Sequence, residues 1–244
     1  MWQIFIQLKE SILNLLFPSF CLNCQKEGDY FCQDCLSLIN ISNYQYCPFC
    51  YPPKIVLDGK TCYFCKKREK KLDGLFSAAS YKNFIIKKLI SQFKYQPYYI
   101  KNLSKVLASL IITHFQLLEN PPPFFGGGQA ILIPIPLEKK KLKQRGFNQA
   151  EEVACQLSNF FKIPLVNNVL IKIKGTLPQV ELSGEAREKN ILGAFACQET
   201  KDIKGKKILL VDDVFTTGAT MEESARVLKK VGAKEVWGVV VARG

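Results

Sequence analysis

The chain has 244 residues, of which 48% are hydrophobic and 23% charged, and this balance excludes a disordered or collagen-like protein. Its 34 Lys and Arg residues outnumber its 21 Asp and Glu residues, and the resulting charge of +13 favours anionic partners such as nucleic acid, phosphorylated metabolites or acidic lipid. His114 is the only histidine, which excludes chemistry that needs several histidines, and its apolar helical neighbours predict a packed side chain.

The first 17 residues predict a short amphipathic helix that ends before Pro18. Its apolar side chains follow helical spacing, at Ile4, Phe5, Leu8, Ile12, Leu15 and Leu16. Lys9 and Glu10 interrupt the apolar run, and the segment lacks the basic start and small-residue cleavage site of a signal peptide. It is also too short to span a membrane. We therefore expect a cytoplasmic chain whose first helix packs on the protein, with peripheral membrane contact as the alternative.

Cysteines dominate residues 1–74, where eight of the ten form four CxxC pairs: Cys21/Cys24, Cys32/Cys35, Cys47/Cys50 and Cys62/Cys65. Two such pairs supply the four thiolates of a closed tetrahedral zinc site. Clustering in CxxC pairs favours metal binding in a reducing compartment, with disulfides or a redox motif as the alternatives. Sequential pairing predicts two structural zinc ions, although an interleaved arrangement stays open. The other two, Cys155 and Cys197, are predicted to be small buried hydrophobic residues.

The rest of the chain, residues 75–244, is predicted to be one α/β domain. Two helices are expected at 84–95 and 98–118, and a Pro- and Gly-rich loop follows at 121–128. Beyond it, a helix at 148–161 and another that ends near Val231 alternate with strands at 131–135, 166–173, 208–211 and 236–242. This alternation predicts a parallel sheet with helices on both faces.

One strand leads into the sharpest motif of the chain. The apolar run 208–211 ends in Asp212 and Asp213, and a small, hydroxyl-rich loop then opens a helix: Thr216, Thr217, Gly218, Ala219 and Thr220. In an open α/β sheet, ligands bind at the carboxyl ends of the strands, and backbone N–H groups at a helix start can hold a phosphate. Two exposed carboxylates there suit the vicinal hydroxyls of a ribose, or Mg²⁺ through water. The motif predicts a ribose 5-phosphate site, the alternative being an ordinary strand-to-helix turn.

The segment 208–220 resembles the phosphoribosyl pyrophosphate (PRPP) motif of type I phosphoribosyltransferases. Further motifs follow the order of the ComF competence family, which the chain resembles over nearly its whole length: the CxxC region, Ile133–Pro136, Arg145–Ala150, Pro178-Gln179, Arg187, Asn190 and Ala194-Phe195. The resemblance implies a parallel-sheet type I phosphoribosyltransferase-like domain at 75–244, preceded by a double zinc-ribbon-like region at 1–74. It also implies a role in natural transformation, in which the protein handles single-stranded DNA entering the cytoplasm, sometimes with a helicase-like partner.

The resemblance also implies roles for individual residues. Asp212 and Asp213 would bind the ribose hydroxyls of PRPP with Mg²⁺, residues 216–220 its 5-phosphate, and Arg187 its pyrophosphate. Thr216 stands where purine-salvage relatives carry an aspartate, and the N-terminus lacks the nucleophilic cysteine that glutamine-dependent amination requires. Three functions stay open: a DNA-uptake protein, an active phosphoribosyltransferase of the amidophosphoribosyltransferase-like kind, and a PRPP-binding regulator without chemistry.

Two basic segments are candidates for contacting single-stranded DNA. The first follows the strand at 131–135 and forms what we expect to be a cationic loop, with Lys139, Lys140, Lys141, Lys143 and Arg145. The second combines cations with aromatic side chains on which bases can stack: Lys87, Lys88, Phe93, Lys94, Tyr95, Tyr98, Tyr99 and Lys101. The apolar residues of this second segment also follow helical spacing, which equally favours a core helix with a solvated lysine face.

Overall fold

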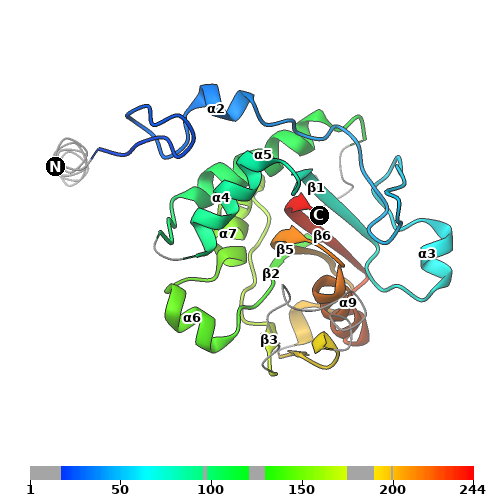
Figure 1. The fold of residues 1–244 in the computed structure, drawn as a ribbon. Helices are drawn as coiled ribbons and strands as arrows, with labels where there is room; N and C mark the ends of the chain where they lie inside the picture. Colours follow the sequence, from blue (N-terminus) through cyan, green and yellow to red (C-terminus); the bar gives the residue numbers. More distant parts are fainter. Residues whose placement is uncertain (1–17, 96–97, 121–129, 175–189, 199) are drawn as a thin grey trace. The chain divides into compact units, whose positions relative to one another are not determined.

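The structure is a computed structural model, and it describes residues 18–95, 98–120, 130–174, 190–198 and 200–244 (Figure 1). The chain divides into two compact units, Met1–Asn40 and Ile41–Gly244. Several sequence predictions lie outside the described residues: the N-terminal helix, the Pro- and Gly-rich loop, Pro178-Gln179 and Arg187. The second group of cysteine pairs belongs to the same compact unit as the sheet, and the division into domains at residue 74 stays a prediction.

The first unit is a small cysteine-rich module. An isolated antiparallel bridge pairs Phe20 with Glu27, and a short helix, α2 (Gln33–Ser37), carries the last of the four cysteines of this unit. Within residues 18–40, the buried hydrophobic side chains other than cysteine are Phe31 and Ile39. A core this small does not fold by apolar burial alone, so a cross-link by a metal ion would supply the missing stability.

The second unit is built on a four-stranded parallel sheet in the order β1-β6-β5-β2. Its strands are β1 (Gly74–Ser80), β2 (Ala130–Pro134), β5 (Lys207–Phe215) and β6 (Glu235–Arg243). The two central strands, β5 and β6, are almost continuously apolar and buried, as strands covered on both faces must be. The structure thus confirms the predicted parallel sheet.

Helices cover both faces of this sheet (Figure 1). One face packs against α5 (Leu103–Leu117) and α7 (Gln149–Phe161), with α4 (Phe84–Lys94) beside α5, and the other face packs against α9 (Ala219–Lys230). The side chains of Asn83 and Asn148 accept hydrogen bonds from the first backbone N–H groups of α4 and α7, and so fix where these helices begin. None of the helices among the described residues combines the length and apolarity that a membrane crossing requires.

Several elements differ from the sequence prediction. Strand β5 continues through Asp212 and Asp213 to Phe215, beyond the predicted strand 208–211. The sequence does not predict β1, because its segment GLFSAAS contains no β-branched residue and so lacks the usual strand signal. The segment 166–173 yields only β3 (Leu170–Lys172), which pairs antiparallel with β4 (Phe195–Cys197) outside the main sheet. The expected cationic loop is a helix, α6 (Lys139–Arg145), because lysine is a good helix former and Gly146 ends the helix at φ +82°.

Single side chains test the remaining core predictions. His114 is fully buried, as predicted, and its Nδ1 donates to the Ser42 carbonyl oxygen at 2.6 Å. The prediction of a buried Cys155 is wrong, because this residue lies on the outward side of α7 and is exposed. Cys197, on β4, is half-buried.

Candidate functional site

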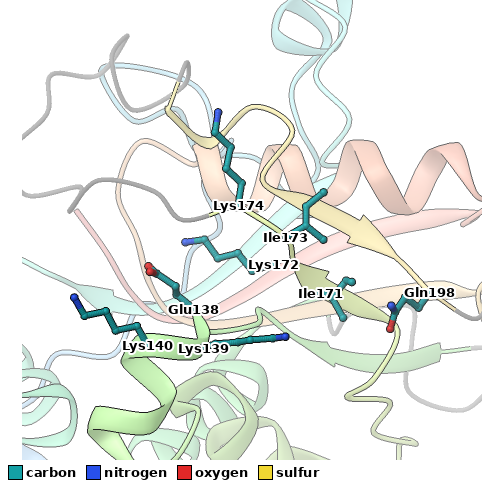
Figure 2. A pocket seen from close by; sticks show the side chains of 8 residues that line it. All are labelled: Glu138, Lys139, Lys140, Ile171, Lys172, Ile173, Lys174 and Gln198. Carbon is teal, nitrogen blue, oxygen red and sulfur yellow. The ribbon is translucent and has the colours of Figure 1, made fainter.

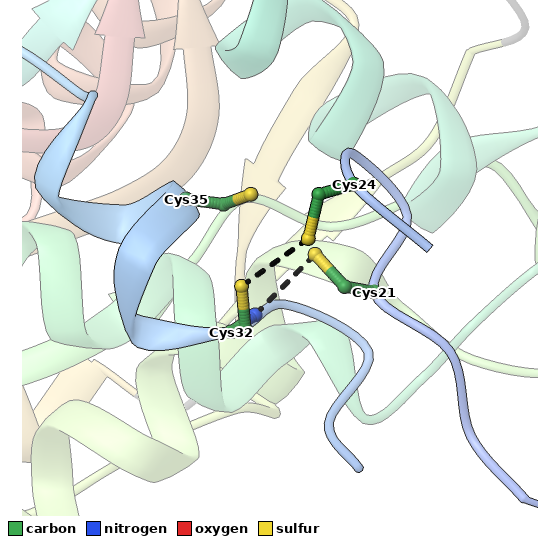
Figure 3. Close-up of side chains that lie close together, drawn as sticks. All are labelled: Cys21, Cys24, Cys32 and Cys35. Atoms are coloured by element: carbon green, nitrogen blue, oxygen red, sulfur yellow. Dashed lines mark hydrogen bonds between the residues drawn. The ribbon is translucent and has the colours of Figure 1, made fainter. Parts of the chain in front are cut away.

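The four thiols of the first two CxxC pairs point toward one another (Figure 3). The sulfur atoms of Cys21, Cys24, Cys32 and Cys35 all lie within 4.8 Å of one another, and those of Cys24 and Cys32 are 3.5 Å apart. The Cys32 backbone N–H donates to the Cys21 sulfur, and the Asn23 side-chain amide donates to the Cys35 sulfur at 3.3 Å. Such donors favour the thiolate form, which is the form that binds a metal. We call this group the first cluster.

The last two CxxC pairs form a second cluster of the same composition in the second unit. Cys47, Cys50, Cys62 and Cys65 again hold their sulfur atoms within 4.8 Å of one another. The Cys50 sulfur lies 3.5 Å from that of Cys62 and 3.7 Å from that of Cys65. A short helix, α3 (Tyr63–Lys67), begins directly after Cys62 and carries Cys65 as its buried residue.

Both clusters fit a tetrahedral zinc ion. Four thiolates at a Zn–S distance of about 2.3 Å stand about 3.8 Å from one another, close to the observed sulfur separations. The structure groups the CxxC pairs sequentially, so the first two could hold one ion and the last two another. Because four protein thiolates leave no coordination position open, a metal at either cluster would be structural.

Backbone hydrogen bonds favour one thiolate in each cluster. Burial raises the pKa of Cys21, but hydrogen bonds from neighbouring backbone N–H groups outweigh burial and bring the pKa down to about 6. In the second cluster, a backbone hydrogen bond from Cys65 lowers the pKa of Cys62 to about 7. Burial and the adjacent thiols raise the pKa of Cys65 itself. A cation is therefore what would hold all four thiols in the ionised form.

The two acids at the end of β5 have different surroundings. Asp213 is only 1% exposed, and its Oδ2 lies 2.5 Å from Nζ of Lys94, at the end of α4. Asp212 is half-buried, and its Oδ1 accepts a hydrogen bond from the Asp213 backbone N–H at 2.9 Å. The expectation of two exposed carboxylates is wrong for Asp213. This carboxylate can be buried because the Lys94 ammonium compensates its charge.

These surroundings separate the pKa values of the two carboxyl groups. Burial raises the pKa of Asp213, but the Lys94 ammonium outweighs burial and lowers it overall. Burial and the Asp213 charge raise the pKa of Asp212 well above its usual range. Burial lowers the pKa of Lys94, but the two acids raise it overall. Lys94 and Asp213 therefore form an ion pair, and Asp212 is the carboxyl group whose charge can respond to a ligand.

The loop after β5 is shaped by Gly218, which takes φ +81° directly before α9. A Cβ at this position would lie 2.4 Å from the Phe215 ring, so both the backbone angle and the packing require glycine. The Ala219 backbone N–H donates to Oγ1 of Thr217 at 3.4 Å, and Thr216 is exposed. The loop thus presents hydroxyl groups and the positive end of a helix at the carboxyl edge of the sheet.

A pocket of about 530 Å³ opens beside α6, close to this edge (Figure 2). Its walls come from the start of α6, from β3 with the two residues after it, and from the residue after β4: Glu138, Lys139, Lys140, Ile171, Lys172, Ile173, Lys174 and Gln198. Burial and the nearby Lys141 lower the pKa of Lys172, whereas Glu138 and Asp212 act in the opposite direction. The pocket is therefore within electrostatic reach of Asp212, and its lysines suit an anionic ligand.

The first basic segment stays at the surface. Four lysines of α6 are exposed: Lys139, Lys140, Lys141 and Lys143. Arg145 is half-buried and its guanidinium donates to the Gln149 side chain. Burial lowers the pKa of Arg145, and Asp213 opposes this effect, so the arginine also faces the acids at the end of β5.

The structure divides the second basic segment. Phe93 belongs to the core, and Lys94 is held by Asp213 with only 18% of its side chain exposed. Tyr95 and Tyr98, by contrast, are about half exposed. The aromatic part of this segment is thus available at the surface, whereas the charge of Lys94 belongs to the acid site.

The sequence motifs do not predict the contacts of three further residues, of which Lys94 is expected at a DNA-binding surface instead. Lys94 follows Ile86 and Ile90 at four-residue spacing on the buried stripe of α4, so helical periodicity is the signal that could have placed it inward. Lys172, on β3, and Arg243, at the end of β6, reach the site through tertiary contacts that leave no local pattern.

Comparisons with known proteins agree with this geometry. Residues 142–244 match the family model of the phosphoribosyl transferase domain. Competence protein F of Haemophilus influenzae is 29% identical over 94% of this chain and 93% of its own length. Competence protein ComFC of Bacillus subtilis is 27% identical over 85% of this chain and 81% of its own length. DNA utilization protein YhgH of Shigella flexneri is 32% identical over 43% of this chain and 47% of its own length.

The matched domain contains the acid pair, the glycine loop, α9 and the two central strands. The similarity to competence protein F extends over nearly the whole chain, including the region of the cysteine clusters. The chain is therefore similar over most of its length to competence protein F and ComFC, and it combines two cysteine clusters with a region that matches the phosphoribosyl transferase domain.

Proposed function

We propose that this chain acts in DNA uptake, binds the ribose 5-phosphate group of PRPP or a nucleotide after β5, and contacts single-stranded DNA through nearby lysines. The observation that carries the proposal is one shared edge of the sheet. Asp212 lies near the end of β5 and the loop 216–220 follows this strand, and the lysines of α6 follow the adjacent strand β2. The names of the relatives, two competence proteins and a DNA utilization protein, support the DNA part.

At the ribose, Asp212 would accept hydrogen bonds from the vicinal hydroxyls or hold Mg²⁺ through water. A cation or hydroxyl donors favour its ionised form, which counteracts the raised pKa. The 5-phosphate would bind to the N–H groups at the start of α9 and to the Thr216 and Thr217 hydroxyls. When bound with PRPP, Mg²⁺ would supply positive charge at the pyrophosphate, where Arg187 is the proposed protein ligand.

The DNA strand is proposed to follow the lysines rather than to enter the ribose site. Deoxyribose lacks one hydroxyl of the vicinal pair, so a carboxylate arranged for that pair favours PRPP or a ribonucleotide. The exposed lysines of α6, with Lys172 and Lys174 in the pocket, offer cations for backbone phosphates. Tyr95 and Tyr98 offer exposed rings on which unpaired bases can stack. A helicase-like partner would hand over or receive this strand.

A second candidate function is active phosphoribosyl transfer. The observation that favours it is the match to the phosphoribosyl transferase domain, which includes the entire acid loop. Release of pyrophosphate from PRPP and Mg²⁺ in the presence of nucleobases would support turnover. Binding of PRPP with no release under the same conditions would leave the protein a binder.

A titration with PRPP and Mg²⁺ tests the ribose site. We expect the wild-type chain to bind, Asp212→Asn to bind at least about tenfold more weakly, and Asp202→Asn, an exposed aspartate in the 3₁₀ turn at 200–202, to bind like the wild type. Equal binding by all three variants would place the site elsewhere. Absence of binding by the wild type would contradict the ribose part of the proposal.

A separate titration with an oligonucleotide tests the DNA surface. The change of Lys139, Lys140 and Lys172 to Gln should weaken binding and reduce its salt dependence, because each lost phosphate contact removes about 0.7 from the slope. The matched control changes three exposed lysines elsewhere: Lys105, Lys162 and Lys230. Equal losses in both sets would indicate net charge rather than a surface. An affinity that does not respond to salt would remove direct DNA binding.

A further inference from the structure

Arg243 connects the end of β6 to the second cysteine cluster. Its Nη1 donates to the Cys47 carbonyl oxygen at 2.9 Å, and its Nη2 donates to the carbonyl oxygens of Pro48 and Cys50 at 3.2 and 3.3 Å. All three acceptors belong to the knuckle 47–50, whose two cysteines are candidate metal ligands. Because a guanidinium presents its N–H groups in a fixed fork, these bonds hold the knuckle backbone in one orientation against the sheet.

The same arginine lies over Phe215, the last residue of β5. The Arg243 guanidinium carbon is 6.0 Å from the centre of the ring, and the two residues are paired in register between β5 and β6. Phe49, inside the knuckle, meets the Phe215 ring edge-on with centroids 6.4 Å apart. Gly218, in the loop, packs so closely on that ring that no Cβ would fit. Phe215 thus contacts both the knuckle and the ribose-phosphate loop.

The shape of the knuckle depends on what its cysteines bind. A CxxC turn stays closed when both thiolates bind one ion, and without the ion no bond joins the two cysteine side chains. Loss of the ion would therefore release the carbonyl groups that Arg243 binds and the Phe49 ring that packs on Phe215. Phe215 would then lose part of the packing that seats Gly218.

We propose that a metal ion in the second cluster holds the loop 216–219 in its phosphate-binding form, with Arg243 and Phe215 as the positioning residues between them. This inference rests on the proposed ribose 5-phosphate site and adds its regulation: the affinity of the loop follows metal occupancy of the second cluster. The first cluster, with the same donor set in the other compact unit, provides an internal control.

The first experiment breaks the link and keeps the metal. Arg243→Lys retains the charge but loses the fork, and the matched control is Arg226→Lys, whose fork binds Glu223 on α9. We expect both variants to contain as much zinc as the wild type. Arg243→Lys should bind ribose 5-phosphate about tenfold more weakly, which corresponds to about 1.4 kcal/mol, and Arg226→Lys should bind like the wild type. Wild-type affinity in Arg243→Lys would overturn the proposal.

The second experiment removes the metal and keeps the link. In a Cys21→Ser, Cys32→Ser chain, the ion that remains belongs to the second cluster, and a chelator removes it. We expect the amide resonances of Thr216, Thr217 and Gly218 to shift and the affinity for ribose 5-phosphate to fall, with a much smaller fall in the added presence of Arg243→Lys. Unchanged resonances after metal loss would overturn the proposal.

These readouts separate the inference from the proposed function. If the wild type does not bind ribose 5-phosphate, the proposed function fails, and the amide resonances alone decide whether metal and loop are coupled. If chelation unfolds the sheet, the amide resonances of metal-loaded Arg243→Lys decide whether the second cluster and the loop are coupled, because that variant removes the Arg243 contacts without metal loss. Loop resonances identical to those of the wild type would then contradict the coupling.

Discussion

The two cysteine clusters have the same four-thiol donor set, but they lie in different structural settings. The first lies in the unit that ends at Asn40, where Phe31 and Ile39 are the buried hydrophobic residues other than cysteine among residues 18–40. The second lies in the unit of the sheet, and its knuckle accepts three hydrogen bonds from Arg243 on β6. The difference teaches that a CxxC pattern indicates a metal site, whereas the contacts of the knuckle decide what the metal supports.

Removal of each metal should give the largest contrast between the clusters. Cys62→Ser should lose one zinc ion and lower the free energy of unfolding of the sheet by more than about 4 kcal/mol, since loss of a structural metal is among the most destabilising changes. Cys32→Ser should lose the other ion and leave that free energy unchanged, because it lies in the first unit. Zinc analysis measures the loss of each ion, and the fluorescence of Trp237, buried in β6, follows unfolding of the sheet by denaturant. Equal destabilisation by the two variants would break the comparison.

Loss of the ion pair between Lys94 and Asp213 should destabilise the same unit without a change to any cysteine. Lys94→Met should cost about 3–5 kcal/mol, because it leaves the buried Asp213 carboxylate without its partner. Because Lys94 lowers the pKa of Asp213 in the folded chain, protonation of Asp213 weakens the wild-type fold as the pH falls. Without Lys94, burial raises this pKa instead, so acidification should restore part of the stability that the variant has lost. Zinc content should stay at the wild-type level. A free energy of unfolding that falls as steeply on acidification in the variant as in the wild type would contradict this role of Lys94.

Two glycines with the same backbone angle test whether the loop depends on Phe215. Gly218→Ala should cost about 2–3 kcal/mol, because the new Cβ clashes with the ring in addition to the strained angle. Gly146→Ala has φ +82° but nothing within 4 Å of the added Cβ, so it should cost about 1 kcal/mol. Thermal unfolding compares the two. Equal costs would mean that the contact with Phe215 does not constrain the loop.

The smallest effect concerns His114, which ties the start of the second unit to α5 through the Ser42 carbonyl. Burial lowers the pKa of His114 in the folded chain, although the hydrogen bond to Ser42 opposes this. The unfolded chain therefore takes up the proton first, so stability falls as the pH drops below about 6.5, by about 1.4 kcal/mol for each unit of pKa difference. His114→Gln should flatten the dependence of unfolding free energy on pH between about 5 and 7. An identical slope would remove this contribution.

Features that are local in sequence could be predicted, and features that depend on distant contacts could not. The CxxC pairs and the acid pair are short patterns. The CxxC pairs gather in two clusters as the sequence predicts, whereas β5 continues through Asp212 and Asp213 to Phe215, beyond the predicted strand 208–211. Strand β1 has no local signal, because its small residues acquire strand structure by pairing with β6. Arg243 and Cys47 are 196 residues apart, and no pattern in the chain connects them.

The acid site shows the same limit in a second way. The adjacent acids Asp212 and Asp213 look equivalent in sequence, and only the approach of Lys94 from α4 distinguishes them. The lysines at 139–143 indicate a cationic segment. Because lysine is a good helix former, this segment forms the helix α6 rather than the expected loop. Packing distinguishes the two acids, whereas α6 follows from a helix propensity that is local in the sequence.

Amide hydrogen exchange, measured by mass spectrometry across the chain, tests the difference between the clusters most directly. The loss of the first metal in Cys32→Ser should speed exchange within residues 18–40 and leave 215–219 unchanged. The loss of the second metal should speed exchange at 215–219 and at the end of β6, because Arg243 and Phe215 connect that cluster to the loop. Unchanged exchange at 215–219 after loss of the second metal, or faster exchange there after loss of the first, would contradict the account.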